Sequence, residues 1–162
     1  MSTVLLEEQL KDPSENLNFS GSFGYTDATY TEDSEETGVT AGQRIVNTPR
    51  MTASLLGQYL FPVADGYQGY IQGNYQWTDD IYDPDAGRGI PKRDAFGTLG
   101  LRFGVQHENW EVVVFADNLT DERGMLFKYI NQAAGVDPFI ADTVGVIRPR
   151  TYGITLRWNG GD

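Results

Sequence analysis

Cysteine and histidine, two residue types that commonly act as nucleophiles or metal ligands, are nearly absent from this chain of 162 residues. There is no Cys and His107 is the single histidine, so neither a thiolate site nor a two-histidine metal centre forms within one chain. Ser54, His107 and Asp117 are the residue types of a catalytic triad, but His107 lies in a predicted turn and no nucleophile-elbow motif surrounds a serine. The glycines fall at strand positions, not at the spacing of a phosphate-binding loop. We therefore predict no enzyme activity and no catalytic residue.

Acidic residues gather in two runs, and the formal net charge is −11. The runs extend from Glu32 to Glu36 and from Asp79 to Asp85. Oxygen ligands in the second run could hold Ca²⁺, but the run lacks the spacing and the glycine of an EF-hand. We interpret both runs as solvated loops and expect neither a metal site nor a cofactor. The negative charge also argues against nucleic acid and anionic lipid headgroups as partners.

The elements that must position any site are predicted from a period of two. The stretch 67–78, YQGYIQGNYQWT, alternates apolar or aromatic residues with amide and hydroxyl residues. This alternation places the two sets on opposite faces of a β-strand. The polar face of this long strand is uncharged, which is typical of a membrane barrel strand between lipid and a wet lumen. The candidates for lumen-facing residues, here and on later strands, are Gln72, Asn74, Gln76, Arg102 and Glu111.

The same alternation recurs along the chain with turn chemistry between the strands. It predicts further strands at 16–26, 51–61, 95–106, 110–117 and 151–158. Short turns at 62–66 and 107–109 alternate with long loops at 31–48, 79–94 and 118–148. All short turns then lie at one end of the sheet and all long loops at the other, as in outer-membrane barrels. Seven aromatic residues near strand ends, typical of membrane-interface girdles, are Tyr59, Phe61, Tyr67, Tyr75, Trp77, Trp110 and Trp158.

We therefore predict an all-β fold with one domain over residues 1–162. It is an antiparallel up-and-down meander of six or seven strands, forming a partial or a small, transmembrane-type β-barrel. Residues 16–158 supply the barrel strands, residues 1–15 are either a strand or a short helix, and residues 159–162 form a tail. Open sheet edges do not persist in lipid, so we expect the segment 16–26 or its N-terminal neighbour to pair with 150–158, within one chain or between two. We also expect Arg102 and Glu111 either to pair across their strands or to join a wider polar network.

Four segments resemble the C-terminal part of the barrel of TonB-dependent outer-membrane receptors. They are NTPR (47–50), GYIQGNYQWTDD (69–80), LGLRFGVQHENWEVVVFADNLTDER (99–123) and RPRTYGITLRW (148–158). The most specific part is NLTDER after a Trp-led strand, followed by a final RPRTYG strand. A departure from the family is Gly124, where an aromatic residue often follows NLTDER. The positions that match the family motifs are Asn118, Leu119, Asp121, Arg148, Arg150, Tyr152 and Gly153, which we interpret as structural because Asx side chains form such corners without a ligand.

The resemblance implies a location and a set of partners. In that family a barrel of twenty-two strands surrounds an N-terminal plug, and members import ferric siderophores, haem, cobalamin or oligosaccharides with energy passed through TonB. It implies the outer membrane of a Gram-negative bacterium, with the barrel remainder, the plug, TonB and surrounding lipid or detergent as partners. The sequence shows no signal peptide, plug or TonB box, so we expect a transport-protein fragment that is not active in energised uptake by itself. The alternative is a small autonomous or engineered β-barrel, a structural or binding module that self-associates through open strand edges.

Overall fold

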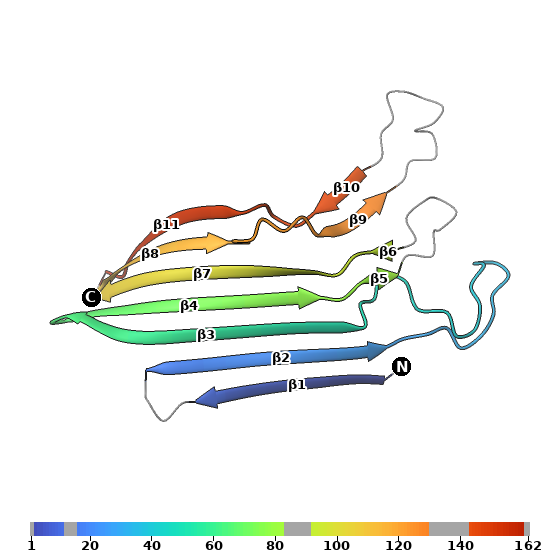
Figure 1. Ribbon diagram of the computed structural model, residues 1–162, viewed down its shortest axis with the longest axis horizontal. Coiled ribbons are helices and arrows are strands. Elements are labelled where there is room, and N and C mark those ends of the chain that lie inside the picture. Colours follow the sequence, from blue (N-terminus) through green and yellow to red (C-terminus); the bar gives the residue numbers. More distant parts are fainter. Residues whose placement is uncertain (1, 12–15, 83–91, 130–142, 161–162) are drawn as a thin grey trace, which may run out of the picture.

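The chain forms one large antiparallel sheet with two short hairpins at one end (Figure 1). The computed structural model describes residues 2–11, 16–82, 92–129 and 143–160. The seven strands of the sheet are β1 (Ser2–Lys11), β2 (Leu17–Asp27), β3 (Met51–Ala64), β4 (Tyr67–Thr78), β7 (Phe96–His107), β8 (Trp110–Asp117) and β11 (Thr151–Trp158). The hairpins are β5 (Ile81–Tyr82) with β6 (Lys92–Arg93), and β9 (Met125–Tyr129) with β10 (Thr143–Val146). In these ranges there is no helix with the length and hydropathy to cross a membrane.

The strand order confirms the predicted up-and-down meander. Each strand of the sheet pairs antiparallel with the next one along the chain, in the order β1-β2-β3-β4-β7-β8-β11. The N-terminal segment, for which a strand and a short helix were alternatives, forms β1. The β3–β4 and β7–β8 connections are tight turns at one end of the sheet, whereas the longer connections and the two hairpins lie at the other end (Figure 1). Gly66 and Glu108 give these turns a residue with φ of 77° and 47° respectively.

Strand register divides the side chains into two faces. Partner residues such as Tyr59↔Ile71, Ile71↔Phe103 and Phe103↔Val114 place one alternating set on the same side of every strand. Leu101 and Val112 belong to this set through Leu101↔Ala116 and Val105↔Val112, as predicted. We call this side the apolar face. Its exposed large side chains include Phe19, Phe23, Leu55, Tyr59, Ile71, Tyr75, Leu101, Phe103, Val114, Ile154 and Leu156.

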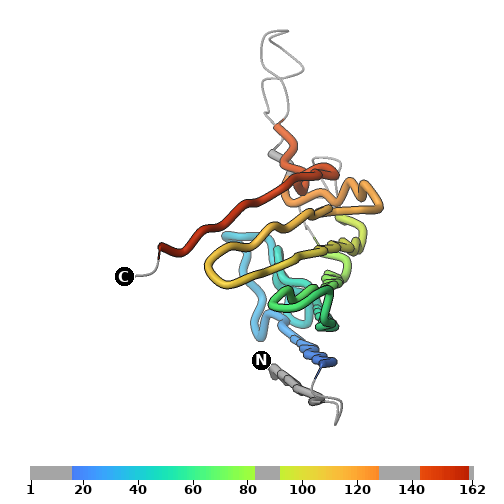
Figure 2. Tube along the Cα trace, turned by 90° about the vertical axis from the view of Figure 1, so that its left-hand side faces the viewer, coloured from blue at the N-terminus to red at the C-terminus, as the bar shows by residue number. Residues whose placement is uncertain are grey.

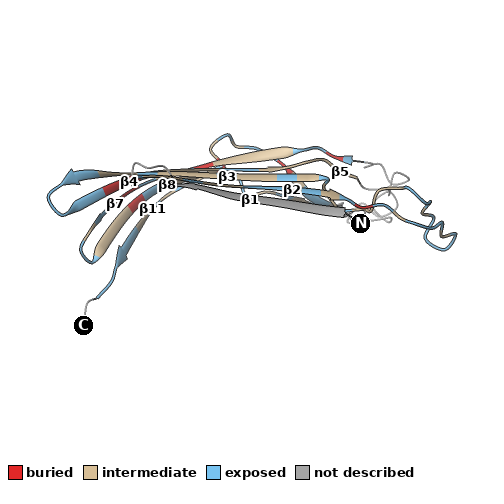
Figure 3. Cartoon of the chain, turned by 90° about the horizontal axis from the view of Figure 1, so that it is seen from below, coloured by how far each residue is buried: buried red, intermediate tan, exposed pale blue. Residues whose placement is uncertain are grey.

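The opposite side, the polar face, carries the amide, hydroxyl and charged side chains of the same strands. No second layer of described residues covers either face, and the sheet is seen edge-on as a single layer (Figure 3). The buried apolar residues in the described part of the chain are only Ala28, Tyr70 and Val113. A soluble domain buries its apolar face against another layer. The described sheet leaves that face exposed, so its apolar side chains need another phase or another protein surface.

The sheet is open, so the structure shows a partial barrel and not a small closed one. β1 and β11 are its two edges and do not pair with each other, and Figure 2 shows β2 and β11 on opposite sides of the sheet. The expected closure within one chain is therefore wrong. Seven strands that alternate in direction leave β1 and β11 running the same way, so self-closure would need a parallel seam in a sheet that is otherwise antiparallel. Pairing between two chains stays a prediction.

Candidate functional site

A hydrogen-bonded network joins three strands on the polar face. The Tyr70 hydroxyl donates to Glu111 Oε1 at 2.8 Å, and Arg157 Nη1 donates to Glu111 Oε2 at 2.6 Å. These residues come from β4, β8 and β11. The Tyr70 ring lies across Gly104 of β7, because a Cβ at that glycine would meet the ring. Glu111 thus accepts hydrogen bonds from a neutral hydroxyl and from a cation, and the network links β4, β8 and β11 on the polar face.

A second ion pair holds the other charged residue that the sequence singled out. Arg102 Nη2 lies 3.2 Å from Asp117 Oδ1. A direct Arg102–Glu111 pair is wrong, because the register places Arg102 opposite Phe115 and Glu111 opposite Gln106. Both charges instead find partners within networks on the polar face. The described charges of β7, β8 and β11 on this face therefore neutralise one another in pairs.

The remaining polar face, over β2, β3 and β4, is uncharged. The Ser22 and Ser54 hydroxyls are 2.7 Å apart, and Gln106 donates to Gln68 at 2.6 Å. Gln72, Asn74 and Gln76, the other lumen-facing candidates, lie on the polar side of β4. An open hollow of about 470 Å³ connects this uncharged part with the charged one. Its lining residues are Tyr70, Gln72, Arg102, Val113, Phe115, Thr155 and Arg157.

The NLTDER segment forms the corner after β8, and Asn118 is its centre. Asn118 is 7% exposed and has φ of 50°, a left-handed conformation that asparagine tolerates. Its Nδ2 donates to the carbonyls of Glu122 and Arg148, both at 2.9 Å, and its Oδ1 accepts from the Glu122 N–H at 2.9 Å. The Leu119 N–H donates to the Leu99 carbonyl at 2.7 Å. The corner therefore ties the end of β8 to the connection that precedes β11.

Asp121 and Arg150 complete this corner. Asp121 Oδ1 accepts from the Arg150 backbone N–H at 3.1 Å, and its Oδ2 lies 3.0 Å from the Arg123 guanidinium. These bonds, first the backbone one and then the side-chain one, lower the pKa of Asp121 from its ordinary value. The Arg150 guanidinium lies over the Tyr152 ring at 5.8 Å. Gly153, the glycine among the positions that match the family motifs, packs under Phe115, because a Cβ on Gly153 would overlap the Phe115 ring. Similarly, the Phe96 ring lies where a Cβ at Gly124 would be, which explains the small residue at that departure from the family pattern.

Contacts among the long loops use residues that the sequence analysis missed. Arg44 Nη1 lies 3.1 Å from Asp80 Oδ2, and Lys92 Nζ lies 3.8 Å from the same oxygen. Arg93, 6% exposed, donates to the Leu126 carbonyl and to Asn47 Oδ1. Asn47, in the NTPR motif, and Asp80, in the second acidic run, gave a signal in the sequence, whereas Arg44, Lys92 and Arg93 gave none. These contacts join the 28–50 loop, the β5–β6 hairpin and β9.

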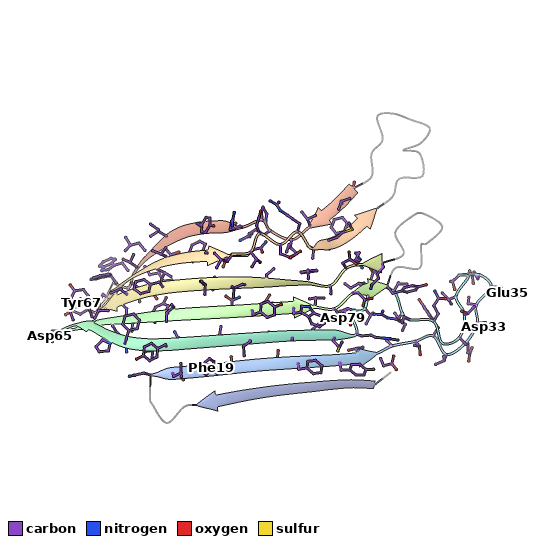
Figure 4. All side chains as sticks on the ribbon, in the orientation of Figure 1. Phe19, Asp33, Glu35, Asp65, Tyr67 and Asp79 are labelled. Carbon is purple, nitrogen blue, oxygen red and sulfur yellow. The ribbon has the colours of Figure 1, made fainter. Side chains whose placement is uncertain are left out.

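Two candidate sites are not assembled by the described residues. Ser54 and Asp117 lie on the polar face, whereas His107 packs on the apolar face against Tyr67 with ring centroids 4.2 Å apart. Asp80 of the second acidic run is engaged by cations, and Asp83 and Asp85 lie outside the described residues. Within the described ranges, no three His, Asp or Glu side chains converge as metal ligands. The first acidic run lies in the loop between β2 and β3, where Figure 4 labels Asp33 and Glu35.

Aromatic side chains lie at both ends of the apolar face. At the short-turn end, Tyr67 packs against His107 and against Trp110, with a centroid distance of 5.9 Å to Trp110, which is opposite Trp158 in the register. Trp77 lies at the long-loop end of the same strand as Tyr67. Ten residues separate the two, which is about 33 Å along a strand and about 25 Å along the axis of a barrel whose strands tilt by about 40–45°. That height matches the apolar band of outer-membrane barrels.

Comparison with known proteins assigns this two-faced sheet to a family. The family model "TonB dependent receptor-like, beta-barrel" matches residues 8–119, more than half of the chain. The chain therefore belongs to the TonB-dependent receptor-like β-barrel family. The match ends before most of the corner residues and before β11. A comparison with curated protein sequences gives no match.

Two solved structures share the fold. The ferric yersiniabactin uptake receptor FyuA from Yersinia pestis superimposes with a TM-score of 0.76 at 19% identity, over 96% of this chain and 23% of that one. BauA, the ferric preacinetobactin receptor from Acinetobacter baumannii, gives a TM-score of 0.65 at 19% identity, over 96% of this chain and 22% of that one. The chain thus spans less than a quarter of either receptor. The sheet resembles a part of each barrel wall.

Proposed function

We propose that this chain is a segment of the barrel wall of an outer-membrane receptor that takes up a ferric siderophore. The proposal rests on the division of the sheet into an apolar and a polar face. The exposed large apolar side chains of β2, β3, β4, β7, β8 and β11 lie on the apolar face. Such a face, about 25 Å high between aromatic ends, suits contact with lipid. The substrate class is proposed from the printed descriptions of FyuA and BauA, which are ferric siderophore receptors.

The polar face fits the wet interior of such a barrel. Its amides and hydroxyls can bond to water, and its described charges are paired, as in Arg102–Asp117 and Arg157–Glu111. Gln72, Asn74, Gln76, Arg102 and Glu111 are then lumen-facing residues. The chain acts together with the other strands of the barrel, a plug and TonB, and it does not drive uptake by itself. The motif residues around Asn118 and Arg150 position the loops and do not bind the substrate.

Site-directed spin labelling tests the assignment of the two faces. The chain contains no Cys, so each introduced cysteine is the only labelling site. Nitroxides are placed at the neighbouring residues Ile71 and Gln72 of β4 and at Leu101 and Arg102 of β7, and the chain is reconstituted in phosphatidylcholine bilayers. Ile71 and Leu101 should collide with oxygen dissolved in lipid, and Gln72 and Arg102 with an aqueous nickel chelate. A label at Glu35, in the β2–β3 loop, is the control and should meet the aqueous reagent.

The alternative, a small autonomous or engineered β-barrel that acts as a structural or binding module, makes a different prediction. If the apolar face is covered by protein, the nickel chelate will still reach Gln72 and Arg102, but labels at Ile71 and Leu101 will be inaccessible to lipid-dissolved oxygen. That outcome would refute the role as a membrane barrel wall. It would leave the β-sheet fold unaffected.

A further inference from the structure

A depression interrupts the apolar face near the middle of β3 and β4. Gly57 and Gly73 are directly opposite each other in the register, and they form the floor of a hollow of about 410 Å³. Its walls include Phe19, Leu55, Tyr59, Ile71, Tyr75 and Leu101. We call this hollow the glycine pit. Figure 4 labels Phe19 on β2, one of the residues that line the pit.

The two glycines contribute differently to the pit. A Cβ at Gly57 would lie 2.8 Å from the Phe19 ring, so Phe19 already covers that glycine. A Cβ at Gly73 would meet only Leu101 Cδ2, at an ordinary contact distance of 3.5 Å. The open volume therefore lies above Gly73, between the Phe19 side and the Leu101 side. It exists because residue 73 has no side chain, while the residues around it on the apolar face are large.

We propose that the glycine pit holds one acyl chain of a bilayer lipid. This inference rests on the proposed membrane function of the sheet, and it adds a defined lipid site to a surface that otherwise meets lipid only generally. Gln58 and Asn74 also border the pit, but the register assigns both to the polar face. The other side chains that line the pit are aliphatic or aromatic. No described charged side chain lines it. An apolar chain that fills the pit gains dispersion contacts with the exposed rings and methyl groups around it.

The position of the pit favours a lipid over a soluble protein partner. Gly73 is six residues from Tyr67 and four from Trp77, so it lies about 15 Å and about 10 Å along the barrel axis from the two aromatic ends. That depth corresponds to the hydrocarbon interior of a bilayer. Interfaces with soluble proteins have a polar rim. The neighbours of the pit on this face are apolar, among them Phe103 and Ala53.

A pair of matched glycine variants tests the site. Gly73→Leu fills the pit, and the space at Gly73 accepts a side chain. Gly21→Leu is the control, because Gly21 also lies on the apolar face, on β2, but does not line the pit. A Cβ on Gly21 would meet its nearest neighbours at 3.5 and 3.6 Å, which are ordinary contact distances. The probe is phosphatidylcholine that carries a nitroxide near the end of one acyl chain, in phosphatidylcholine bilayers. Electron spin resonance then gives the number of motionally restricted lipids per chain.

We expect Gly73→Leu to lower that number by about one per chain and Gly21→Leu to leave it unchanged. Equal numbers in the wild-type chain and in Gly73→Leu would overturn the lipid site. A mass in detergent that falls by half in Gly73→Leu would also overturn it, because a second copy would then be the occupant. The face-labelling experiment separates these results from a failure of the membrane function. If Ile71 and Leu101 are in lipid while Gly73→Leu has no effect, only the lipid site is wrong.

Discussion

Replacing Asn118 tests whether the corner after β8 holds the long-loop end of the sheet together. The side chain is 7% exposed and makes three hydrogen bonds of 2.9 Å with main-chain groups of Glu122 and Arg148. Each such bond contributes about 1 kcal/mol net to stability. Asn118→Ala also places alanine at φ of 50°, which costs about 1 kcal/mol more. The expected loss is therefore about 4 kcal/mol of unfolding free energy.

Two other variants at this position separate the backbone cost from the hydrogen bonds. Asn118→Gly accepts the left-handed conformation but loses all three bonds, so we expect a loss of about 3 kcal/mol. Asn118→Asp retains the bond from the Glu122 N–H and loses the two donated bonds, so it should lose about 2 kcal/mol or more. The control is Asn109→Ala in the β7–β8 turn, where the side chain is exposed and the change should stay within about 0.5 kcal/mol.

The assay is urea unfolding of the chain in detergent micelles, followed by tryptophan fluorescence. Hydrogen exchange at the Leu119 amide, which bonds to the Leu99 carbonyl, gives a local measure of the same corner. Exchange there should be faster in Asn118→Ala and unchanged in Asn109→Ala. If Asn118→Ala unfolds at the same urea concentration as Asn109→Ala, the corner does not stabilise the sheet and the reasoning is wrong.

Four further predictions follow from the faces, the packing and the charges. Ile71→Arg should cost about 2–4 kcal/mol of unfolding free energy in bilayers, whereas Gln72→Arg on the other face of β4 should cost less than about 1 kcal/mol; equal costs would contradict the face assignment. Gly104→Val should cost about 1–3 kcal/mol in urea unfolding, because its side chain displaces the Tyr70 ring; a stability equal to wild type would show that the ring can move freely. Because folding lowers the pKa of Asp121, its contribution to stability is present above the ordinary value of about 3.9 and is lost as pH falls below it. Urea midpoints measured from about pH 6 to about pH 2 should therefore fall less steeply in Asp121→Asn, and identical slopes would exclude the effect. Receptor-deficient cells that express only this chain with an added export signal should not accumulate ferric siderophore, and uptake that depends on TonB would refute the role as a wall segment.

The sequence alone determined the long strands from β2 to β11 and their two faces, whereas the short hairpin strands β5, β6, β9 and β10 fall in stretches that it predicted as loops. Alternation with a period of two is a local property, because neighbouring side chains of a strand point to opposite sides whatever the strand pairs with. The YQGYIQGNYQWT stretch therefore predicted β4 within the same bounds that the structure gives. The alternation of short turns and long loops likewise predicted the meander, since tight turns such as 62–66 leave antiparallel pairing as the only local solution.

Only the tertiary structure decided which polar groups meet. Tyr70 and Glu111 are 41 residues apart, and Arg157 is 46 residues beyond Glu111, so their network depends on the register of four adjacent strands. Register also decided against the Arg102–Glu111 pair, because side chains on one face choose among neighbours at several cross-strand positions. The open edges and the glycine pit depend in the same way on which strands lie side by side. A period of two fixes the face of a residue, but only the assembled sheet fixes its neighbours.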